Sequence, residues 1–106
     1  MKIRIAGTGL TKFGELWDKS LLDLAIDAST EAIQDSNLKL QDIEAVFVGN
    51  MIAGKIEGQN HLGALVASSL RIKGAGFKVE GACASGGLAI HLAVQSILAN
   101  TYQNVL

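Results

Sequence analysis

Residues 79–88 read Val-Glu-Gly-Ala-Cys-Ala-Ser-Gly-Gly-Leu. This pattern is typical of the end of a buried strand, followed by a tight turn and the start of an apolar helix. Gly81, Gly86 and Gly87 allow the backbone to turn sharply and let another element approach closely. Cys83, the single cysteine of the chain, lies at this junction. We therefore expect the segment to hold a thiol between a strand and a helix.

A thiol at the start of a helix meets unpaired backbone N–H groups and the positive end of the helix dipole. Both favour the thiolate, which is the nucleophilic form of cysteine. The small residues around Cys83 also leave room for a substrate carbonyl. A single cysteine among small residues is also typical of a small buried hydrophobic side chain. Spacing alone leaves both interpretations open.

Strand and helix patterns alternate along the whole chain. Apolar and β-branched runs predict strands over residues 2–6, 43–49 and 77–80, and the first residues of a fourth strand at 105–106. Apolar residues at helical spacing predict three helices: one from the cap Ser20 to about residues 36–37, one over residues 61–70 and one over residues 84–100. This β-α-β-α-β-α-β order predicts an α/β fold with a mainly parallel sheet and helices on both faces.

The first predicted helix has a clear start signal. Ser20 is a good N-cap, and Asp23 stands three residues further on. Asp23, Asp27 and Glu31 follow one another at four-residue steps. Three carboxylates could serve acid–base chemistry, but amphipathic helices ordinarily present such a row to solvent, and we expect a solvated face. The apolar stripe consists of Leu21, Leu24, Ala25, Ala28 and Ala32.

The helix predicted over residues 84–100 is apolar on nearly every face. Such a helix is typical of an element buried inside a larger body. We therefore expect a buried central helix and interpret residues 1–106 as an incomplete domain. Residues 11–18 are expected to form a loop from which Phe13 and Trp17 pack onto the body, and residues 50–60 a second, polar loop.

The composition argues against several classes of protein. A length of 106 residues suits one domain, and a formal net charge of -1 without any basic cluster argues against nucleic acid or an anionic membrane as partners. One cysteine permits no internal disulfide and suits a reducing compartment, so we expect a cytoplasmic protein. No apolar run approaches the roughly 20 residues of a membrane span, and the first residues lack the apolar core of a signal peptide.

Several chemical motifs are incomplete in this chain. A dinucleotide fingerprint over residues 7–12 would need a third glycine where Lys12 stands. The sequence around Lys55 lacks the hydroxyl residue and the glycine spacing of a phosphate loop. Ser85 is not a nucleophile-elbow serine, because position 83 would have to be glycine. No group of His, Cys, Asp or Glu residues has the spacing of a metal site, so no metal is expected.

Residues 79–87 resemble the nucleophile segment of the thiolase family, in its archaeal or sterol-carrier-protein-like branch. A second block agrees: residues 48–51, Val-Gly-Asn-Met, and residues 58–67, Gly-Gln-Asn-His-Leu-Gly-Ala-Leu-Val-Ala, are similar to the same branch. Residues 5–9 and 11–14 also fit. The resemblance spans essentially the whole chain and implies the beginning of a thiolase-like N-terminal domain.

The resemblance implies a CoA-dependent acyltransferase, which condenses acyl-CoAs to 3-ketoacyl-CoA or cleaves that product through a cysteine acyl-enzyme. Cys83 would then be the catalytic nucleophile, and its backbone N–H would contribute to an oxyanion hole. Coenzyme A thioesters would be substrates, with no permanently bound cofactor, and no CoA-binding residue is assigned. Thiolases also use an activating histidine and a second cysteine in motifs that this chain does not contain, so the 106 residues alone should be inactive.

Other residues in the matching blocks have both structural and functional interpretations. His61 stands where a helix should begin, and a direct role for it rests on weak evidence. We expect His91 to be a core or interface residue, and Met51, Gln59 and Asn60 to serve loop structure and dimer packing. The resemblance also implies a homo-oligomer through the N-terminal domain and possible association with other acyl-CoA enzyme subunits. The alternative function is a non-catalytic, truncated or degenerate chain that acts as an assembly module; a decarboxylating ketoacyl synthase fits the flanks of Cys83 less well.

Overall fold

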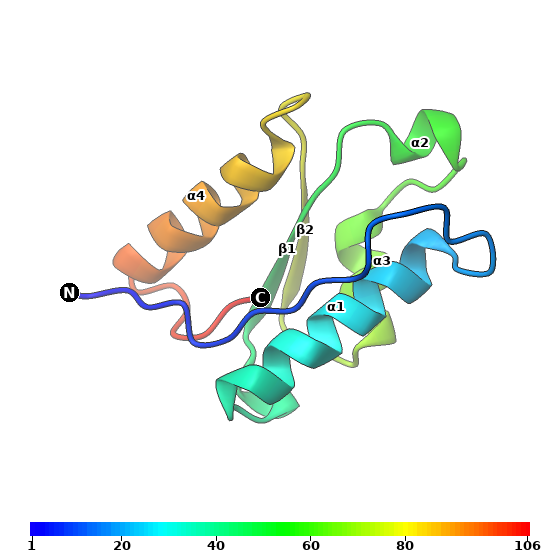
Figure 1. The fold of residues 1–106 in the computed structure, drawn as a ribbon. Helices are drawn as coiled ribbons and strands as arrows, with labels where there is room; N and C mark the ends of the chain where they lie inside the picture. The colour runs from blue at the N-terminus through cyan, green and yellow to red at the C-terminus, as the bar shows by residue number, and fades with distance from the viewer.

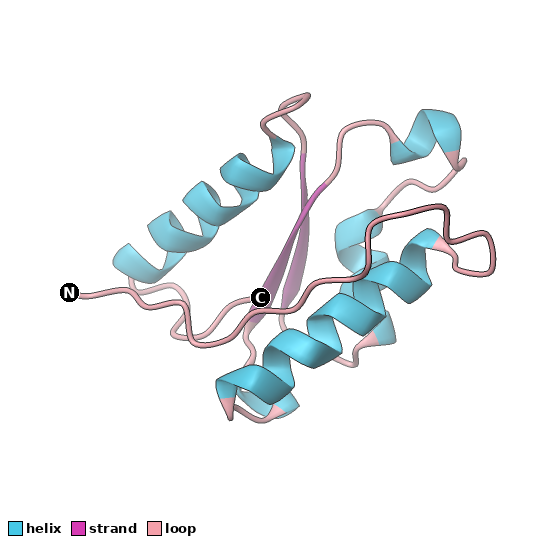
Figure 2. Cartoon of the chain, viewed as in Figure 1, coloured by secondary structure: helices cyan, strands magenta, loops and turns pink.

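The computed structural model describes residues 1–106, which form a two-stranded parallel sheet surrounded by helices (Figure 1). Helices and strands alternate only in part, and the first twenty residues contain neither (Figure 2). The elements in chain order are α1 Leu21–Ser36, a 3-10 turn Leu40–Asp42, β1 Ala45–Gly49, α2 Ala53–Ile56, α3 Leu62–Ser69, β2 Ala75–Val79 and α4 Ser85–Leu98.

The sheet is parallel, as the sequence predicts. β1 and β2 pair in register from Ala45 opposite Ala75 to Gly49 opposite Val79. On the other edge of β1, Val105 forms a parallel bridge with Ala45, and the backbone N–H of Phe47 donates to the carbonyl of Leu106 at 2.8 Å. The prediction that a further strand begins at residues 105–106 is therefore confirmed, and β1 lies in the middle of the sheet.

Helices cover both faces of the sheet, which confirms the predicted layering. In Figure 1, α3 and α1 lie on one side of the strands and α4 on the other. Gly63 allows α3 to lie directly on β2, because a Cβ atom at this position would come within 2.5 Å of the Phe77 carbonyl carbon. The main core lies under α3 and consists of Ile43, Val46, Val66, Ala67, Leu70 and Ile72.

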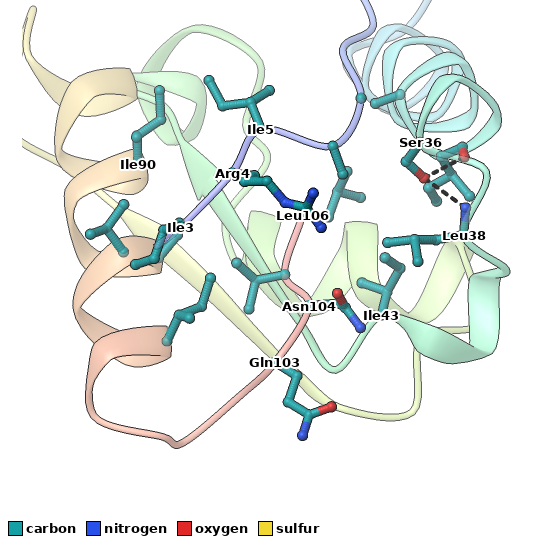
Figure 3. Close-up of a pocket in the computed structure, with 18 residues that line it drawn as sticks. Ile3, Arg4, Ile5, Ser36, Leu38, Ile43, Ile90, Gln103, Asn104 and Leu106 are labelled. Atoms are coloured by element: carbon teal, nitrogen blue, oxygen red, sulfur yellow. Dashed lines mark hydrogen bonds between the residues drawn. The ribbon is translucent and has the colours of Figure 1, made fainter. Parts of the chain in front are cut away.

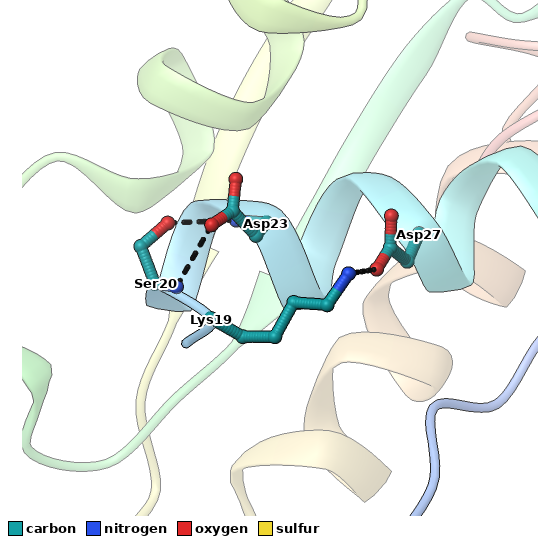
Figure 4. Close-up of polar contacts among 4 residues, drawn as sticks. All are labelled: Lys19, Ser20, Asp23 and Asp27. Carbon is teal, nitrogen blue, oxygen red and sulfur yellow. Dashed lines mark hydrogen bonds and ion pairs between the residues drawn. The ribbon is translucent and has the colours of Figure 1, made fainter. Parts of the chain in front are cut away.

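α1 begins and ends where the sequence predicts. The hydroxyl of Ser20 accepts the backbone N–H of Asp23 at 3.0 Å, while the Asp23 carboxylate accepts the backbone N–H of Ser20 at 2.9 Å (Figure 4). The hydrogen bond that the Asp23 carboxylate accepts from the Ser20 backbone N–H, and after it the Ser20 side chain, hold the pKa of Asp23 below its usual value. Lys19 donates to Asp27 at 2.8 Å, which raises the pKa of Lys19. The acidic row is exposed and serves the cap and an ion pair, so the solvated face is confirmed.

The strand predicted over residues 2–6 is wrong for this structure. No backbone hydrogen bond joins residues 1–15 to another strand, although the N–H of Thr8 donates to the carboxylate of Asp35 at 2.9 Å. Gly7 and Gly9 instead lie against the backbone of α1, where a Cβ on Gly7 would come within 2.3 Å of the Ala32 carbonyl oxygen. Alternating Ile3 and Ile5 satisfy the strand pattern, but a strand also requires a paired neighbour.

A further prediction about burial is wrong, and a second one is not tested within these residues. Phe13 and Trp17 do not pack onto the body, since they are 86% and 87% exposed. Within these residues α4 is only partly covered: Ser85 and Ala89 are buried, whereas Ile90 is 67% exposed. One face of α4 lies on the sheet, against both β1 and β2. The burial expected for this helix inside a larger body therefore stays a prediction.

Two elements differ from prediction, and a third agrees with it. The loop predicted over residues 50–60 contains the short helix α2. β2 begins at Ala75 rather than residue 77, because Gly76 fits against the backbone of Gly63, where a side chain would collide. α3 matches the predicted helix within one or two residues, with Leu62 and Val66 buried and Leu65 half-buried. No helix is both long and apolar enough to cross a membrane.

Candidate functional site

A tight turn joins the end of β2 to the start of α4. Val79 ends the strand in the core, with 7% of its surface exposed. The N–H of Ala84 then donates to the carbonyl of Gly81 at 3.0 Å, and the N–H of Ser85 donates to the carbonyl of Ala82 at 3.2 Å. These two consecutive hydrogen bonds, each spanning three residues, fold residues 81–85 into compact turns. The strand, turn and helix expected over residues 79–88 are all present.

Cys83 lies at the tip of this turn and is exposed. α4 begins at Ser85 with Ala84 as its N-cap residue, so the thiol stands one residue before the cap. The backbone N–H groups of Cys83, Gly86 and Gly87 donate to no acceptor within the chain. The interpretation of Cys83 as a small buried hydrophobic residue is therefore wrong: the thiol is accessible, beside unpaired N–H groups at a helix start.

Gly49 brings the strand β1 against the first turn of α4. A Cβ atom on Gly49 would lie 2.6 Å from the Ser85 carbonyl oxygen and 2.8 Å from the Cα of Gly86. The absence of a side chain at position 49 thus fixes how closely the turn with Cys83 approaches the sheet. This glycine lies in the second block of the sequence resemblance, but its contact with the turn could be recognised only in three dimensions.

Residues of the second block follow β1 at the same end of the sheet. The loops after β1 and β2 leave the same edge, because the strands are parallel, and Asn50 N–H donates to the carbonyl of Val79 at 3.2 Å. The side chain of Asn50 caps α2 by accepting the N–H of Ala53 at 2.8 Å. Met51 is 41% exposed. These contacts hold the loop beside the turn.

The end of that loop is arranged by local hydrogen bonds. The side-chain amide of Gln59 donates to the carbonyl of Asn60 at 2.6 Å. His61 is the N-cap residue of α3, with a left-handed φ of 58° and an exposed side chain that makes no capping hydrogen bond. His91 is exposed on α4 and is therefore not a core residue of this chain, while the alternative that it is an interface residue stays a prediction. Neither histidine forms a hydrogen bond with Cys83.

Ser85 is the residue that sequence reasoning missed. Its side chain is 5% exposed, accepts the N–H of Gly81 at 3.0 Å and donates to the carbonyl of Ala82 at 2.7 Å. The sequence motif excluded Ser85 as a nucleophile-elbow serine and indicated no other role for it. The side chain of a serine in the first turn of a helix commonly forms hydrogen bonds with the preceding backbone, and the position of Ser85 at the helix start could have indicated this role.

An apolar cavity of about 250 Å³ lies away from Cys83, between the N-terminal segment, α1, α4 and residues 103–106 (Figure 3). Thirteen of its 18 lining residues are hydrophobic. The hydroxyl of Ser36 on its wall is already occupied, since it donates to the carbonyl of Ile33 and accepts the N–H of Leu38. The cavity contains no nucleophile and no pair of titratable groups, so it offers no chemistry of its own. Nor do three or more His, Cys, Asp or Glu residues gather anywhere in the structure.

Comparison with known proteins agrees with this geometry. The family model described as "Thiolase, N-terminal domain" matches residues 3–106. The chain is 38% identical over 105 residues to an acetyl-CoA acetyltransferase of Methanocaldococcus jannaschii and 37% identical over 105 residues to one of Methanothermobacter thermautotrophicus. It is 39% identical over 99 residues to the benzoylsuccinyl-CoA thiolase subunit BbsB of Thauera aromatica.

These matches cover 98% of the chain for both archaeal proteins and 91% for the Thauera protein. The chain spans only 27%, 27% and 24% of the three relatives, respectively. The turn with Cys83 lies within the residues that the family model matches. The resemblance inferred from residues 79–87 is confirmed: the chain belongs to the thiolase family and corresponds to its N-terminal domain.

Proposed function

We propose that residues 1–106 are the nucleophile-bearing part of a CoA-dependent acyltransferase of the thiolase type. The observation that supports this most directly is the exposed thiol of Cys83 at the turn between β2 and α4, in a chain 38% identical to an acetyl-CoA acetyltransferase. A nucleophile must reach its substrate, and this thiol is accessible. Coenzyme A thioesters are the proposed substrates, with no permanently bound cofactor.

In the proposed reaction, the thiolate of Cys83 attacks the carbonyl carbon of an acyl-CoA. The carbon–sulfur bond to coenzyme A breaks, CoA leaves as a thiolate that takes up a proton, and the acyl group remains on Cys83. A second acyl-CoA, deprotonated at its α-carbon, then attacks the acyl-enzyme. The new carbon–carbon bond gives 3-ketoacyl-CoA and releases the Cys83 thiolate; the reverse sequence cleaves a 3-ketoacyl-CoA.

The backbone around Cys83 supports the negative charge that such a reaction develops. Attack on a thioester places charge on the carbonyl oxygen, and N–H groups that are free in advance stabilise it without rearrangement. The unpaired N–H groups of Cys83, Gly86 and Gly87 are of this kind. We propose that the N–H of Cys83 donates to the oxyanion, with the start of α4 adding the favourable end of its dipole.

The proton transfers of this reaction need further groups. His61 and His91 are exposed and make no hydrogen bond with Cys83, so neither is proposed as its base. We propose that the activating base and the second acid–base group come from segments outside residues 1–106, and that these residues alone do not turn over. A cytoplasmic, reducing location suits a free catalytic thiol.

Assembly with other subunits is a further part of the proposal. The name of the Thauera relative describes a thiolase subunit. In this chain β2 pairs only with β1, and the exposed apolar side chains Leu88, Ile90, Leu92 and Leu98 lie on α4. We propose a homo-oligomer through the N-terminal domain, with other acyl-CoA enzyme subunits as possible partners. Light scattering on the purified protein should give a mass of at least two protomers; a monomer at micromolar concentration would contradict this.

The experiment that tests the activity compares wild-type protein with Cys83→Ala and Cys83→Ser. Thiolysis of a 3-ketoacyl-CoA and the condensation of acetyl-CoA are followed in the intact protein. Both variants should lose turnover, because neither a methyl group nor an unactivated hydroxyl replaces the thiolate. Ser68→Ala, an exposed change on α3, serves as the control and should keep wild-type rates. Normal turnover by Cys83→Ala would refute the proposed role. A wild-type protein that assembles but never turns over would favour the non-catalytic assembly module.

A further inference from the structure

Ser85 is the buried polar side chain of the turn, and both of its hydrogen bonds go to the turn itself. It is 5% exposed. Its Oγ accepts the N–H of Gly81, four residues back, and donates to the carbonyl of Ala82, three residues back. The hydroxyl therefore joins the first residue of α4 to the two residues that precede Cys83.

The hydrogen bonds of Ser85 hold Ala82 in an unusual backbone conformation. Its φ of 52° lies in the left-handed region, which residues with a Cβ atom adopt uncommonly. Such a conformation persists only where the surrounding contacts hold it. The Ser85 hydroxyl holds the carbonyl of Ala82, and the carboxylate of Glu80 accepts the N–H of Ala82 at 2.6 Å. Both backbone polar groups of Ala82 are thus hydrogen-bonded, the carbonyl by the buried Ser85 and the N–H by the exposed Glu80.

Cys83 has no such anchors of its own. Its N–H donates to nothing and its side chain is exposed, so its orientation depends on the residues on either side. We propose that Ser85 is a positioning residue, which fixes Ala82 so that the thiol and the N–H of Cys83 face the same substrate carbonyl. This inference rests on the proposed function, because it assumes that an acyl group is transferred to Cys83. Ser85 itself is no nucleophile, since its hydroxyl is buried and already makes two hydrogen bonds.

The same helix offers a matched control. The hydroxyl of Ser96 donates to the carbonyl of Ala93 at 2.7 Å, which repeats the bond of Ser85 to Ala82 in length and in spacing. Ser96 lies eleven residues further along the chain from Ser85, near the other end of α4. Ser96→Ala therefore removes an equivalent serine bond from α4 and leaves the turn intact.

The test compares the wild-type protein, Ser85→Ala and Ser96→Ala in the intact protein, with acetyl-CoA and iodoacetamide as probes. Acetylation of Cys83 needs the thiol and the N–H to be aligned, whereas alkylation of an exposed thiol does not. For Ser85→Ala we expect acetylation to slow by about 10- to 100-fold, the range that small misplacements of reacting groups cause. Alkylation should change by less than about threefold. Ser96→Ala should match the wild type in both reactions.

Acetylation of Ser85→Ala at the wild-type rate would overturn the inference. An equal slowing of both reactions, or an equal slowing of acetylation in Ser96→Ala, would show a general structural effect and would also overturn it. If Ser85→Ala fails to fold, Glu80→Ala replaces it: Glu80 is exposed, and loss of its bond to Ala82 should slow acetylation in the same selective way.

Failure of the proposed function is recognised separately. If the wild-type protein alkylates at Cys83 but never acetylates there, the function is refuted, and amide hydrogen exchange at Gly81 decides the role of Ser85 in the turn. The N–H of Gly81 is protected by the Ser85 hydroxyl and should exchange faster in Ser85→Ala and not in Ser96→Ala. Unchanged exchange at Gly81 would refute the bracing itself.

Discussion

Replacing Gly49 by alanine should force the turn with Cys83 away from the sheet. The new Cβ atom would lie 2.6 Å from the carbonyl oxygen of Ser85 and 2.8 Å from the Cα of Gly86. Both are backbone atoms, so no side-chain rotation relieves the collision. The optimal van der Waals separation of two carbon atoms is about 3.5 Å, so the first turn of α4 must move away from β1 by roughly 1 Å.

This retreat has two expected consequences. Overpacking of a close contact costs about 1–3 kcal/mol in the free energy of unfolding, which urea denaturation of the intact protein measures. A shift of 1 Å in a reacting group also slows the reaction by about 100-fold, which the rate of Cys83 acetylation measures. Ser68→Ala on α3 is the control for acetylation, and Gly87→Ala is the control for stability alone, because no atom lies within 4 Å of its new Cβ. Alanine in that helical position should stabilise the protein by about 0.5–1 kcal/mol. A Gly49→Ala protein with wild-type stability and acetylation would refute the reasoning.

Three further predictions concern stability, each measured by urea denaturation of the intact protein. Ser20→Ala should lower the free energy of unfolding by about 1 kcal/mol, because α1 loses its N-cap, whereas Ser20→Asp should keep most of the stabilisation that the cap provides. Equal losses in the two variants would contradict the capping role. Because folding lowers the pKa of Asp23, its stabilisation is present above the pKa of the unfolded state and is lost as pH falls through the folded pKa. Asp23→Asn should therefore be less stable than wild type at neutral pH and equal to it in acid, and a difference independent of pH would refute this. Leu62→Ala, at a site 2% exposed, should cost about 2–5 kcal/mol, but Ile56→Ala, at a site 67% exposed, should change stability by no more than about 0.5 kcal/mol; similar costs would contradict the observed burial.

Features that depend on local sequence could be predicted well. The start of α1 follows from Ser20 and Asp23, which lie within one turn of each other and close the capping box by themselves. The turn at residues 79–88 is equally local, since its glycines, its cysteine and the following apolar helix are adjacent. The apolar run at residues 43–49 indicated a covered strand, and β1 has helices on both sides.

Features that depend on distant partners could not be predicted. Residues 2–6 have the alternation of a strand, yet their structure depends on whether a neighbouring strand is present to accept their hydrogen bonds. The exposure of Phe13 and Trp17 depends likewise on what lies opposite them. At the site, Gly49 and Ser85 matter because β1 and α4 meet there, and no spacing along the chain reveals that contact.

The most direct test of the account is to identify the residue that acquires an acetyl group when the intact protein meets acetyl-CoA. The sample is quenched in acid during turnover, and its peptides are sequenced by mass spectrometry. The account predicts an acetyl thioester on Cys83, absent from Cys83→Ala and removed when free coenzyme A is added before the quench. An active protein that acetylates at another residue, or whose Cys83 stays unmodified throughout turnover, would contradict it.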